Sequence, residues 1–123
     1  MAQTIESVLK RLEHSKFRSS FHLCKKDIDY INDKGLDVIQ KHAQDFISQR
    51  LAPADIPNDG KQTPMKGHPV FIAQHATACC CRGCLNKWYH IPKDRPLTLK
   101  EEENVVKIIM AWIIKDYKRQ NLK

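Results

Sequence analysis

Apolar side chains recur every three or four residues along most of this chain of 123 residues, and that spacing constrains its fold most. The spacing puts apolar groups on one face of an α-helix, and no segment shows the sustained alternation typical of a β-strand. The sequence therefore predicts an all-α fold, a single compact domain over residues 1–123 with about five or six helices. The expected apolar faces are Ile5, Val8, Leu9 and Leu12; Ile28 and Ile31; Leu36, Ile39, Ala43, Phe46 and Ile47; and Val105, Ile108, Ile109, Trp112 and Ile113.

Residues that begin and end helices support these assignments. Thr4 and Asp27 are expected N-caps, and Gly35 is expected to end the second helix. Thr98 and Glu101 have the spacing of a capping box at the start of the last helix. Between the helical patterns, residues 52–67 contain three prolines and two glycines, which predicts a long irregular loop leading to a cluster of cysteine and histidine.

Basic residues outnumber acidic ones, and the formal charge of +7 is unevenly spread. Residues 61–100 contain seven Lys or Arg and a single acidic residue, Asp94, a formal charge of +6. A basic surface attracts nucleic acid or another polyanion, although it also serves solubility alone. The expected nucleic-acid contacts are Lys61, Lys66, Arg82, Lys87, Lys93 and Arg95, with Trp88 stacking on an unpaired base.

The N-terminal residues mix charged and apolar side chains and lack the continuous apolar stretch of a signal peptide. No run of 18 apolar residues, the length of a membrane span, is present. We therefore expect a cytoplasmic protein without membrane contact, in which cysteines stay reduced. The odd total of five cysteines also argues against a complete disulfide framework.

Four of those cysteines lie within six positions: Cys79, Cys80, Cys81 and Cys84. With Thr77 as its cap, a helix through residues 79–88 is expected. At about 100° per residue, such a helix brings Cys80, Cys81 and Cys84 within an arc of about 100°, whereas Cys79 points away. The sequence therefore predicts a converging trio of thiols, with some distortion where two of them are adjacent.

Zinc is the expected metal, because it takes four thiolate or imidazole ligands in a tetrahedron. His75 and His90 are the nearest candidates for a fourth ligand, and His68 is a third. An iron–sulfur cluster is the alternative, although it usually takes four thiolates. Two further interpretations stay open: thiols that merely pack in the core, and redox-active thiols activated by Arg82 and Lys87.

Several strings in the chain resemble a small bacterial family, the domain of unknown function numbered 4186. The strings are Arg50-Leu-Ala-Pro-Ala, Asn58-Asp-Gly-Lys-Gln-Thr-Pro, Gly67-His-Pro-Val-Phe-Ile-Ala-Gln-His-Ala-Thr-Ala, Cys80-Cys-Arg-Gly-Cys-Leu and Lys87-Trp. The resemblance spans about residues 17–113 and implies a bacterial or phage origin, but no reaction. The family pattern has threonine at the position of Cys79 and histidine at that of Tyr89, which favours His75 over His90 as a ligand.

Three functions fit these observations. The leading one is a non-catalytic helical module that is stabilised by zinc and binds an anionic partner. The second is a metal-dependent, hydrolase-like enzyme, in which three protein ligands leave an open zinc position and Asp59, Lys61 or His68 completes the site. The third is a thiol redox sensor that uses Cys80 and Cys81. Four protein ligands would close the zinc site, whereas three leave room for water.

Overall fold

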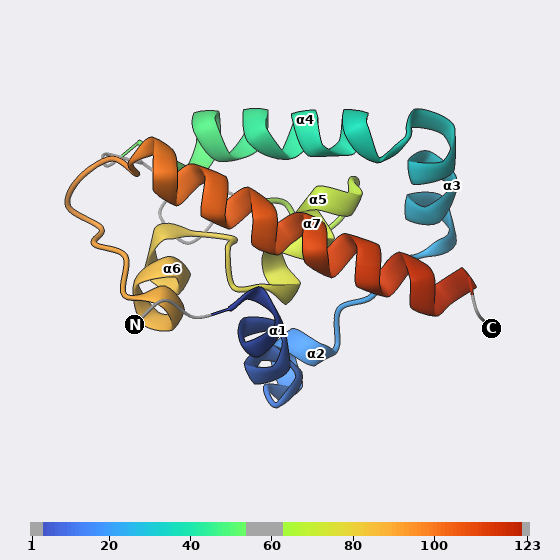
Figure 1. Ribbon diagram of the computed structural model, residues 1–123, viewed down its shortest axis with the longest axis horizontal. Helices are drawn as coiled ribbons and strands as arrows, with labels where there is room; N and C mark the ends of the chain where they lie inside the picture. The colour runs from blue at the N-terminus through green and yellow to red at the C-terminus, as the bar shows by residue number, and fades with distance from the viewer. Residues whose placement is uncertain (1–3, 54–62, 122–123) are drawn as a thin grey trace.

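The computed structural model describes residues 4–53 and 63–121. Within these ranges the chain forms seven α-helices and one π-helical segment, and no β-strand (Figure 1). The predicted all-α fold is therefore confirmed. The elements are α1 (Ile5–Glu13), α2 (Lys16–Ser19), α3 (Lys25–Lys34), α4 (Leu36–Phe46), the π-helix η1 (Ile47–Leu51), α5 (Pro69–Ala76), α6 (Arg82–Tyr89) and α7 (Leu99–Asn121).

The long helix α7 crosses the whole molecule (Figure 1), and α1, α4, η1 and α5 pack against it. Its apolar stripe is buried at Val105, Ile109 and Ile113, where α4, η1 and α5 contact it. The capping box at its start forms as predicted: Glu101 N–H donates to Thr98 Oγ1 (3.1 Å), and Thr98 N–H donates to Glu101 Oε1 (2.9 Å).

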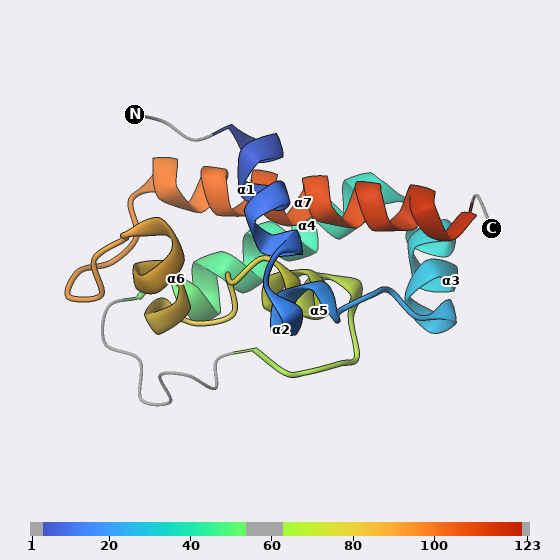
Figure 2. The same cartoon turned by 90° about the horizontal axis from the view of Figure 1, so that it is seen from below.

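Helices α1 and α2 form a separate layer, in which α1 packs on α7 and α2 packs on α5 (Figure 2). Thr4 caps α1 as predicted, since its hydroxyl accepts from Ser7 N–H. The sequence did not predict α2, because a helix of four residues is too short to show an apolar period. Ser15 nevertheless caps it by accepting from Arg18 N–H, and this short helix places Arg18 in the interior.

Arg82 at the start of α6 is also buried, with only 2% of its surface exposed. Its guanidinium donates to backbone carbonyls before and after the helix, namely those of Leu51, Ala52, Pro53, Pro92 and Arg95. These bonds tie the end of η1 to the segment before α7. Arg82 is therefore a structural residue of the interior, and its predicted role in contacting nucleic acid is wrong.

Two further expectations concern the loop and the surface. Most of the loop predicted at residues 52–67 lies outside the described residues, and its described parts, 52–53 and 63–67, are non-helical as predicted.

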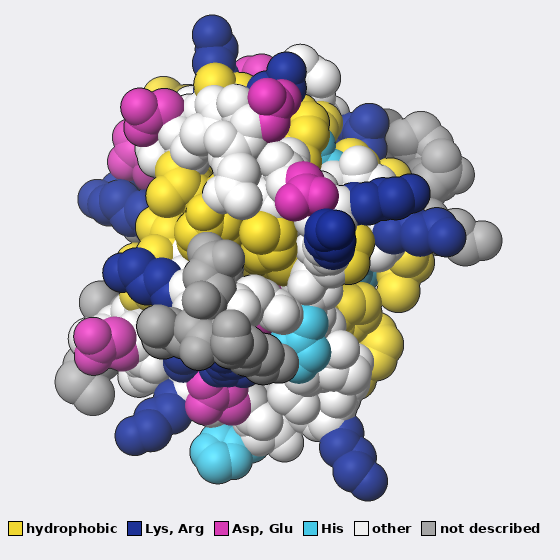
Figure 3. Space-filling model, turned by 90° about the vertical axis from the view of Figure 1, so that its right-hand side faces the viewer, with side chains coloured by type: hydrophobic (Ala, Val, Ile, Leu, Met, Phe, Trp, Pro, Cys, Tyr) yellow, Lys and Arg dark blue, Asp and Glu magenta, His cyan; other side chains and the backbone are white. Residues whose placement is uncertain are grey.

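In the parts of the chain that the structure describes, no helix is long and apolar enough to cross a membrane. On the face formed by α3 and the C-terminal end of α7, basic side chains are spread out and interspersed with acidic ones (Figure 3).

Candidate metal centre

A tight turn between α5 and α6 carries the cysteine cluster. Helix α5 ends at Ala76, and Ala78 then takes the left-handed conformation (φ 59°), which reverses the chain. Cys79 N–H donates to Gln74 O (2.8 Å), and the Gln74 side chain in turn donates to Cys79 O (3.1 Å). Thr63 Oγ1 donates to Cys80 O (2.8 Å). Backbone contacts thus fix the turn before α6 begins.

The helix predicted through residues 79–88 is therefore wrong in its first part. Thr77 ends α5 instead of starting a helix, and α6 begins only at Arg82. Cys81 is its N-cap, in extended conformation, and its sulfur accepts from Cys84 N–H (3.4 Å). The physical reason is the left-handed residue Ala78, which an apolar pattern does not reveal.

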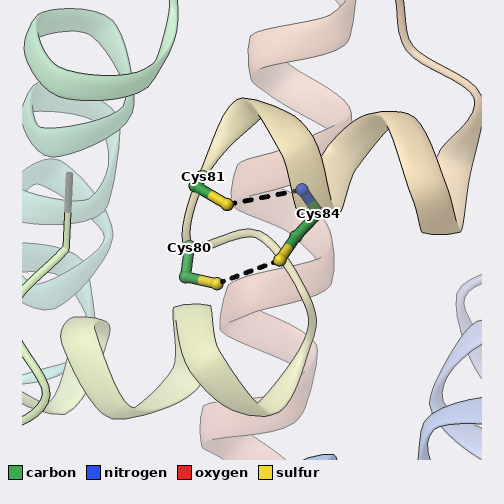
Figure 4. A group of neighbouring side chains, drawn as sticks. All are labelled: Cys80, Cys81 and Cys84. Carbon is green, nitrogen blue, oxygen red and sulfur yellow. Dashed lines mark hydrogen bonds between the residues drawn. The ribbon is translucent and has the colours of Figure 1, made fainter. Parts of the chain in front are cut away.

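The turn nevertheless brings the predicted trio together. The sulfurs of Cys80, Cys81 and Cys84 all lie within 4.8 Å of one another (Figure 4). Cys80 and Cys81 come from the turn, and Cys84 comes from the first turn of α6. The Sγ atoms of Cys80 and Cys84 are 3.6 Å apart. Two ligand sulfurs of a tetrahedral ion with bonds of about 2.3 Å are about 3.8 Å apart, so this group can hold a metal ion.

Cys79 takes no part in the group, which agrees with the sequence prediction. Its side chain is fully buried among the core residues, and its thiol donates to Thr77 O (3.5 Å). Burial raises the pKa of the Cys79 thiol to about 11. The fifth cysteine, Cys24, is exposed at the start of α3. Both cysteines lie outside the converging trio.

Arg18 was not foreseen as part of the site. Its Nη2 donates to Cys84 Sγ (3.2 Å), and its Nη1 lies 3.6 Å from Cys80 Sγ and donates to His75 O (2.7 Å). The side chain is 8% exposed. Arg18 is 62 and 66 positions from these cysteines, so no local pattern in the sequence predicts the contact.

These contacts create unequal thiols. Hydrogen bonds from the Cys80 and Cys81 thiols, together with the Arg18 guanidinium, hold the pKa of the Cys84 thiol well below its usual range. The pKa of Cys80 is raised because its thiol proton is held by hydrogen bonds to Cys81 and Cys84, and because it is buried. One thiolate is thus stabilised within the trio, and thiolate is the form that binds metals.

His75, the predicted fourth ligand, is not among the converging ligand atoms. Its Nε2 lies 3.2 Å from Thr63 O and 3.1 Å from Pro64 O, so that nitrogen donates to carbonyls. Its ring also stacks on Phe21, with centroids 5.5 Å apart. In this arrangement His75 holds residues 63–64 beside the turn, and its backbone carbonyl accepts a hydrogen bond from Arg18.

The other proposed ligands are also separate from the trio where the structure describes them. His68 caps α5, because its Nδ1 accepts from Val70 N–H (3.0 Å), and its Nε2 lies 3.0 Å from His42 Nδ1. His90 is exposed in left-handed conformation at the end of α6. Asp59 and Lys61 lie outside the described residues.

The residues predicted to bind nucleic acid differ in their exposure and in their partners. Lys66, Lys87 and Lys93 are exposed, whereas Arg95 pairs with Glu101 through two hydrogen bonds of 2.7 and 2.9 Å. Trp88 is half-buried, with the Arg11 guanidinium 5.5 Å from its ring centroid. Lys61 is outside the described residues, and Arg82 is interior.

Comparison with known proteins extends the resemblance seen in the sequence. No solved structure matches the chain. The family model for a domain of unknown function, DUF4186, matches residues 6–114. The match includes α5, α6 and the turn that carries the three converging thiols, as well as Arg18. The chain therefore belongs to the DUF4186 family.

Proposed function

We propose that this protein binds one zinc ion through the thiolates of Cys80, Cys81 and Cys84. The observation that carries the proposal is the convergence of the three sulfurs within 4.8 Å, with a closest described separation of 3.6 Å. That separation matches the edge of a zinc–thiolate tetrahedron, about 3.8 Å. The neighbouring guanidinium of Arg18 further favours the thiolate forms that a metal requires.

Zinc fits this donor set better than an iron–sulfur cluster does. A cluster usually takes four thiolates, whereas the fourth cysteine of the segment, Cys79, is buried in the apolar core. Soft thiolate ligands in a compact tetrahedral arrangement favour Zn²⁺ over the harder divalent ions. Iron is therefore the competing outcome of the metal analysis rather than the preferred ion.

The ion's role in this proposal is to fix the turn between α5 and α6. The turn passes through left-handed Ala78 and places three thiols close together, which is unfavourable when more than one of them is charged. A divalent ion would offset that cost and link the turn to the first residues of α6. The protein would then be a non-catalytic helical module in which the metal holds the turn between α5 and α6 in place.

A second candidate is a centre with a ligand-accessible position. Three thiolates leave one position of a tetrahedron to a group from outside the trio, and Cys84 is only partly buried. This arrangement favours the metal-dependent enzyme among the alternatives. A position taken by water would respond to added small anions or thiols, whereas a position closed by a protein group would not.

Elemental analysis of protein purified without added metal tests the proposal. We expect about one zinc per chain, and loss of that zinc when Cys80, Cys81 or Cys84 is replaced by serine. Cys24→Ser is the matched control, since this exposed cysteine lies outside the trio. Protein that lacks metal and takes up neither zinc nor cobalt would contradict the proposal. A disulfide between Cys80 and Cys81 in such protein would favour the redox sensor.

Cobalt substitution distinguishes the two candidates. Co²⁺ in a tetrahedral thiolate site gives visible absorption that reports on its ligands. If the fourth position is open, adding cyanide or a small thiol should change the spectrum in the wild type. An unchanged spectrum would favour a fourth ligand from the protein itself and the non-catalytic module.

A further inference from the structure

We infer that Arg18 is a positioning residue of the metal–thiolate centre, where it balances the charge and holds two of the three sulfurs. The inference rests on the proposed metal site and deepens it. No sequence pattern distinguishes Arg18, whereas in the structure it is buried with its guanidinium against the thiols. Burying a charged side chain is costly unless it is paired, so its partners define its role.

The guanidinium is aimed at the centre by several contacts. Its two terminal nitrogens have different partners. Nη2 donates to Cys84 Sγ (3.2 Å), and Nη1 donates to His75 O (2.7 Å) and lies 3.6 Å from Cys80 Sγ. The planar fork of arginine can span two acceptors in this way, whereas the single ammonium of lysine acts as a point charge. One side chain thus fixes the relative positions of two ligands.

Short helix α2 supplies this orientation. Ser15 caps the helix through Arg18 N–H, and the Phe17 ring lies 4.9 Å from the guanidinium carbon. Phe21, just beyond the helix, stacks on His75. The segment 15–21 therefore docks on α5 with Arg18 beneath it, and its only other charged residue, Lys16, is exposed.

Charge explains why an arginine belongs at this position. Three thiolates and one divalent ion carry a net charge of −1, and Cys80 and Cys81 are both buried. The Arg18 guanidinium brings the group to neutrality. A guanidinium cannot be deprotonated in a protein at ordinary pH, so the side chain keeps its charge against the two sulfurs. A neutral cluster avoids the cost of an uncompensated buried charge.

Hydrogen bonds to sulfur also change the bonding of the metal. An N–H donor stabilises the sulfur lone pair, so the thiolate donates less charge to the ion and absorbs at higher energy. Outer contacts of this kind typically change metal affinity by about 10–100-fold. Arg18 therefore has a measurable effect beyond its contribution to folding.

Three variants test this inference: Arg18→Met, Arg18→Lys and, as a matched control, Lys16→Met, which removes the same charge from an exposed position on the same helix. Zinc affinity is measured by competition with a chromophoric chelator, and the thiolate-to-cobalt band is measured in Co²⁺-loaded protein. Circular dichroism establishes that each variant is folded.

We expect Arg18→Met to lose about 10–100-fold in zinc affinity and to shift the cobalt band to longer wavelength. Arg18→Lys should recover part of the affinity, because it keeps the charge, but should still shift the band. Lys16→Met should change neither. A loss of stability alone would not shift the charge-transfer energy in a folded variant that binds cobalt stoichiometrically.

Wild-type affinity and an unshifted band in folded Arg18→Met would overturn the inference. If Arg18→Met does not fold, Arg18→Lys decides, and an unshifted band with unchanged affinity there would overturn it equally. Either result would leave the zinc proposal intact, provided that the wild type binds zinc. Absence of metal binding in the wild type would instead contradict the proposed function.

Discussion

Cys79 and Cys80 are neighbours in the chain but belong to different parts of the molecule. Cys79 lies in the apolar core with no exposed surface, while the sulfur of Cys80 faces Cys84 and Arg18. The turn between α5 and α6 separates them, because its backbone is fixed on both sides of Cys79 by hydrogen bonds to Gln74. In the amino-acid composition these four cysteines are equivalent. In the structure one of them packs in the core and three are candidate metal ligands.

This division predicts opposite effects for two serine substitutions. Cys84→Ser should abolish metal binding. Cys79→Ser should retain the metal but lower the free energy of unfolding by about 1–3 kcal/mol, because it buries a more polar group in the core. The metal content of both variants tests the expected loss of metal, and their urea unfolding curves test the expected loss of stability. Loss of metal in Cys79→Ser, with its helical content unchanged, would mean that Cys79 belongs to the site.

At the scale of elements, His68 links helix α5 to α4. Its Nδ1 accepts from Val70 N–H, so its proton resides on Nε2 and is donated to His42 Nδ1. Tyr30, Phe46 and Phe71 surround its ring, with centroids 5.1–5.5 Å away. Both ring nitrogens are therefore engaged in the neutral form, and a second proton would break the cap of α5.

The folded protein should consequently lose stability in acid through this residue. Burial and the neighbouring His42 lower the pKa of His68 from 6.5 to about 4, although Asp27 opposes the shift. Because the unfolded chain takes up the proton first, the stabilisation is complete above about pH 6.5 and is lost as the pH falls towards 4. His68→Asn keeps a capping side chain without the titration.

Urea unfolding at pH 7.5, 6 and 5, with chelator present to remove any metal, measures this effect. The stability of the wild type should fall more steeply with acid than that of His68→Asn. His14→Asn, at an exposed histidine, should behave like the wild type. Equal acid sensitivity of His68→Asn and the wild type would exclude His68 as the source.

The elements also show which parts of the structure can be predicted from sequence. The capping box of α7 and the cap of α1 were predictable, because the interacting residues lie three positions apart. The start of α6 was not, because it depends on the left-handed Ala78 and on Thr63 and Gln74 holding the turn from elsewhere in the chain. The correct trio emerged although the predicted helix began too early.

Long-range burial explains the remaining differences. Arg18 and Arg82 look like ordinary surface charges in the sequence, yet each is buried, with its terminal guanidinium nitrogens bonded to distant partners. Neither partner set is encoded by local spacing, so no periodicity identifies them. His75 illustrates the converse, since its position near the thiols suggested a ligand, whereas its Nε2 contacts two carbonyls.

At the scale of the whole molecule, most of the apolar core is independent of the thiol trio. The larger cluster of buried side chains joins α4, η1, α5 and α7 through residues such as Ile39, Leu51, Val70 and Ile109. Unlike a zinc finger, whose fold depends on its metal, this protein has enough core to remain folded without one. Metal should therefore raise the stability of an already folded chain.

We expect the chelated protein to keep its helical circular dichroism but to unfold at lower urea concentration than the zinc-loaded protein. At free zinc of about 1,000 times the dissociation constant, the difference should be about 4 kcal/mol. Cys84→Ser should unfold at the same urea concentration with and without zinc. Complete loss of helix on chelation would mean that the metal is required for the fold itself.

The positive charge of the molecule gives the last prediction. Of the basic residues expected to contact nucleic acid, Lys66, Lys87 and Lys93 are exposed in the structure. We propose that these three form a weak contact for a polyanion. With about three phosphates neutralised, the logarithm of the affinity for a single strand should fall with the logarithm of salt at a slope of about −2.

Titration of a labelled single-stranded oligonucleotide at low and at physiological salt tests this prediction. Replacing Lys66, Lys87 and Lys93 together with alanine should weaken binding and flatten the salt dependence. Replacing the exposed Lys16, Lys25 and Lys26 removes the same charge from elsewhere on the molecule and should have a smaller effect. Equal losses in the two triple variants would mean that only net charge attracts the polyanion.

Because Trp88 is half-buried beside Arg11, its ring is not free to stack on a base, and duplex and single strand should bind alike. A strong preference for single strands would require this ring to become exposed.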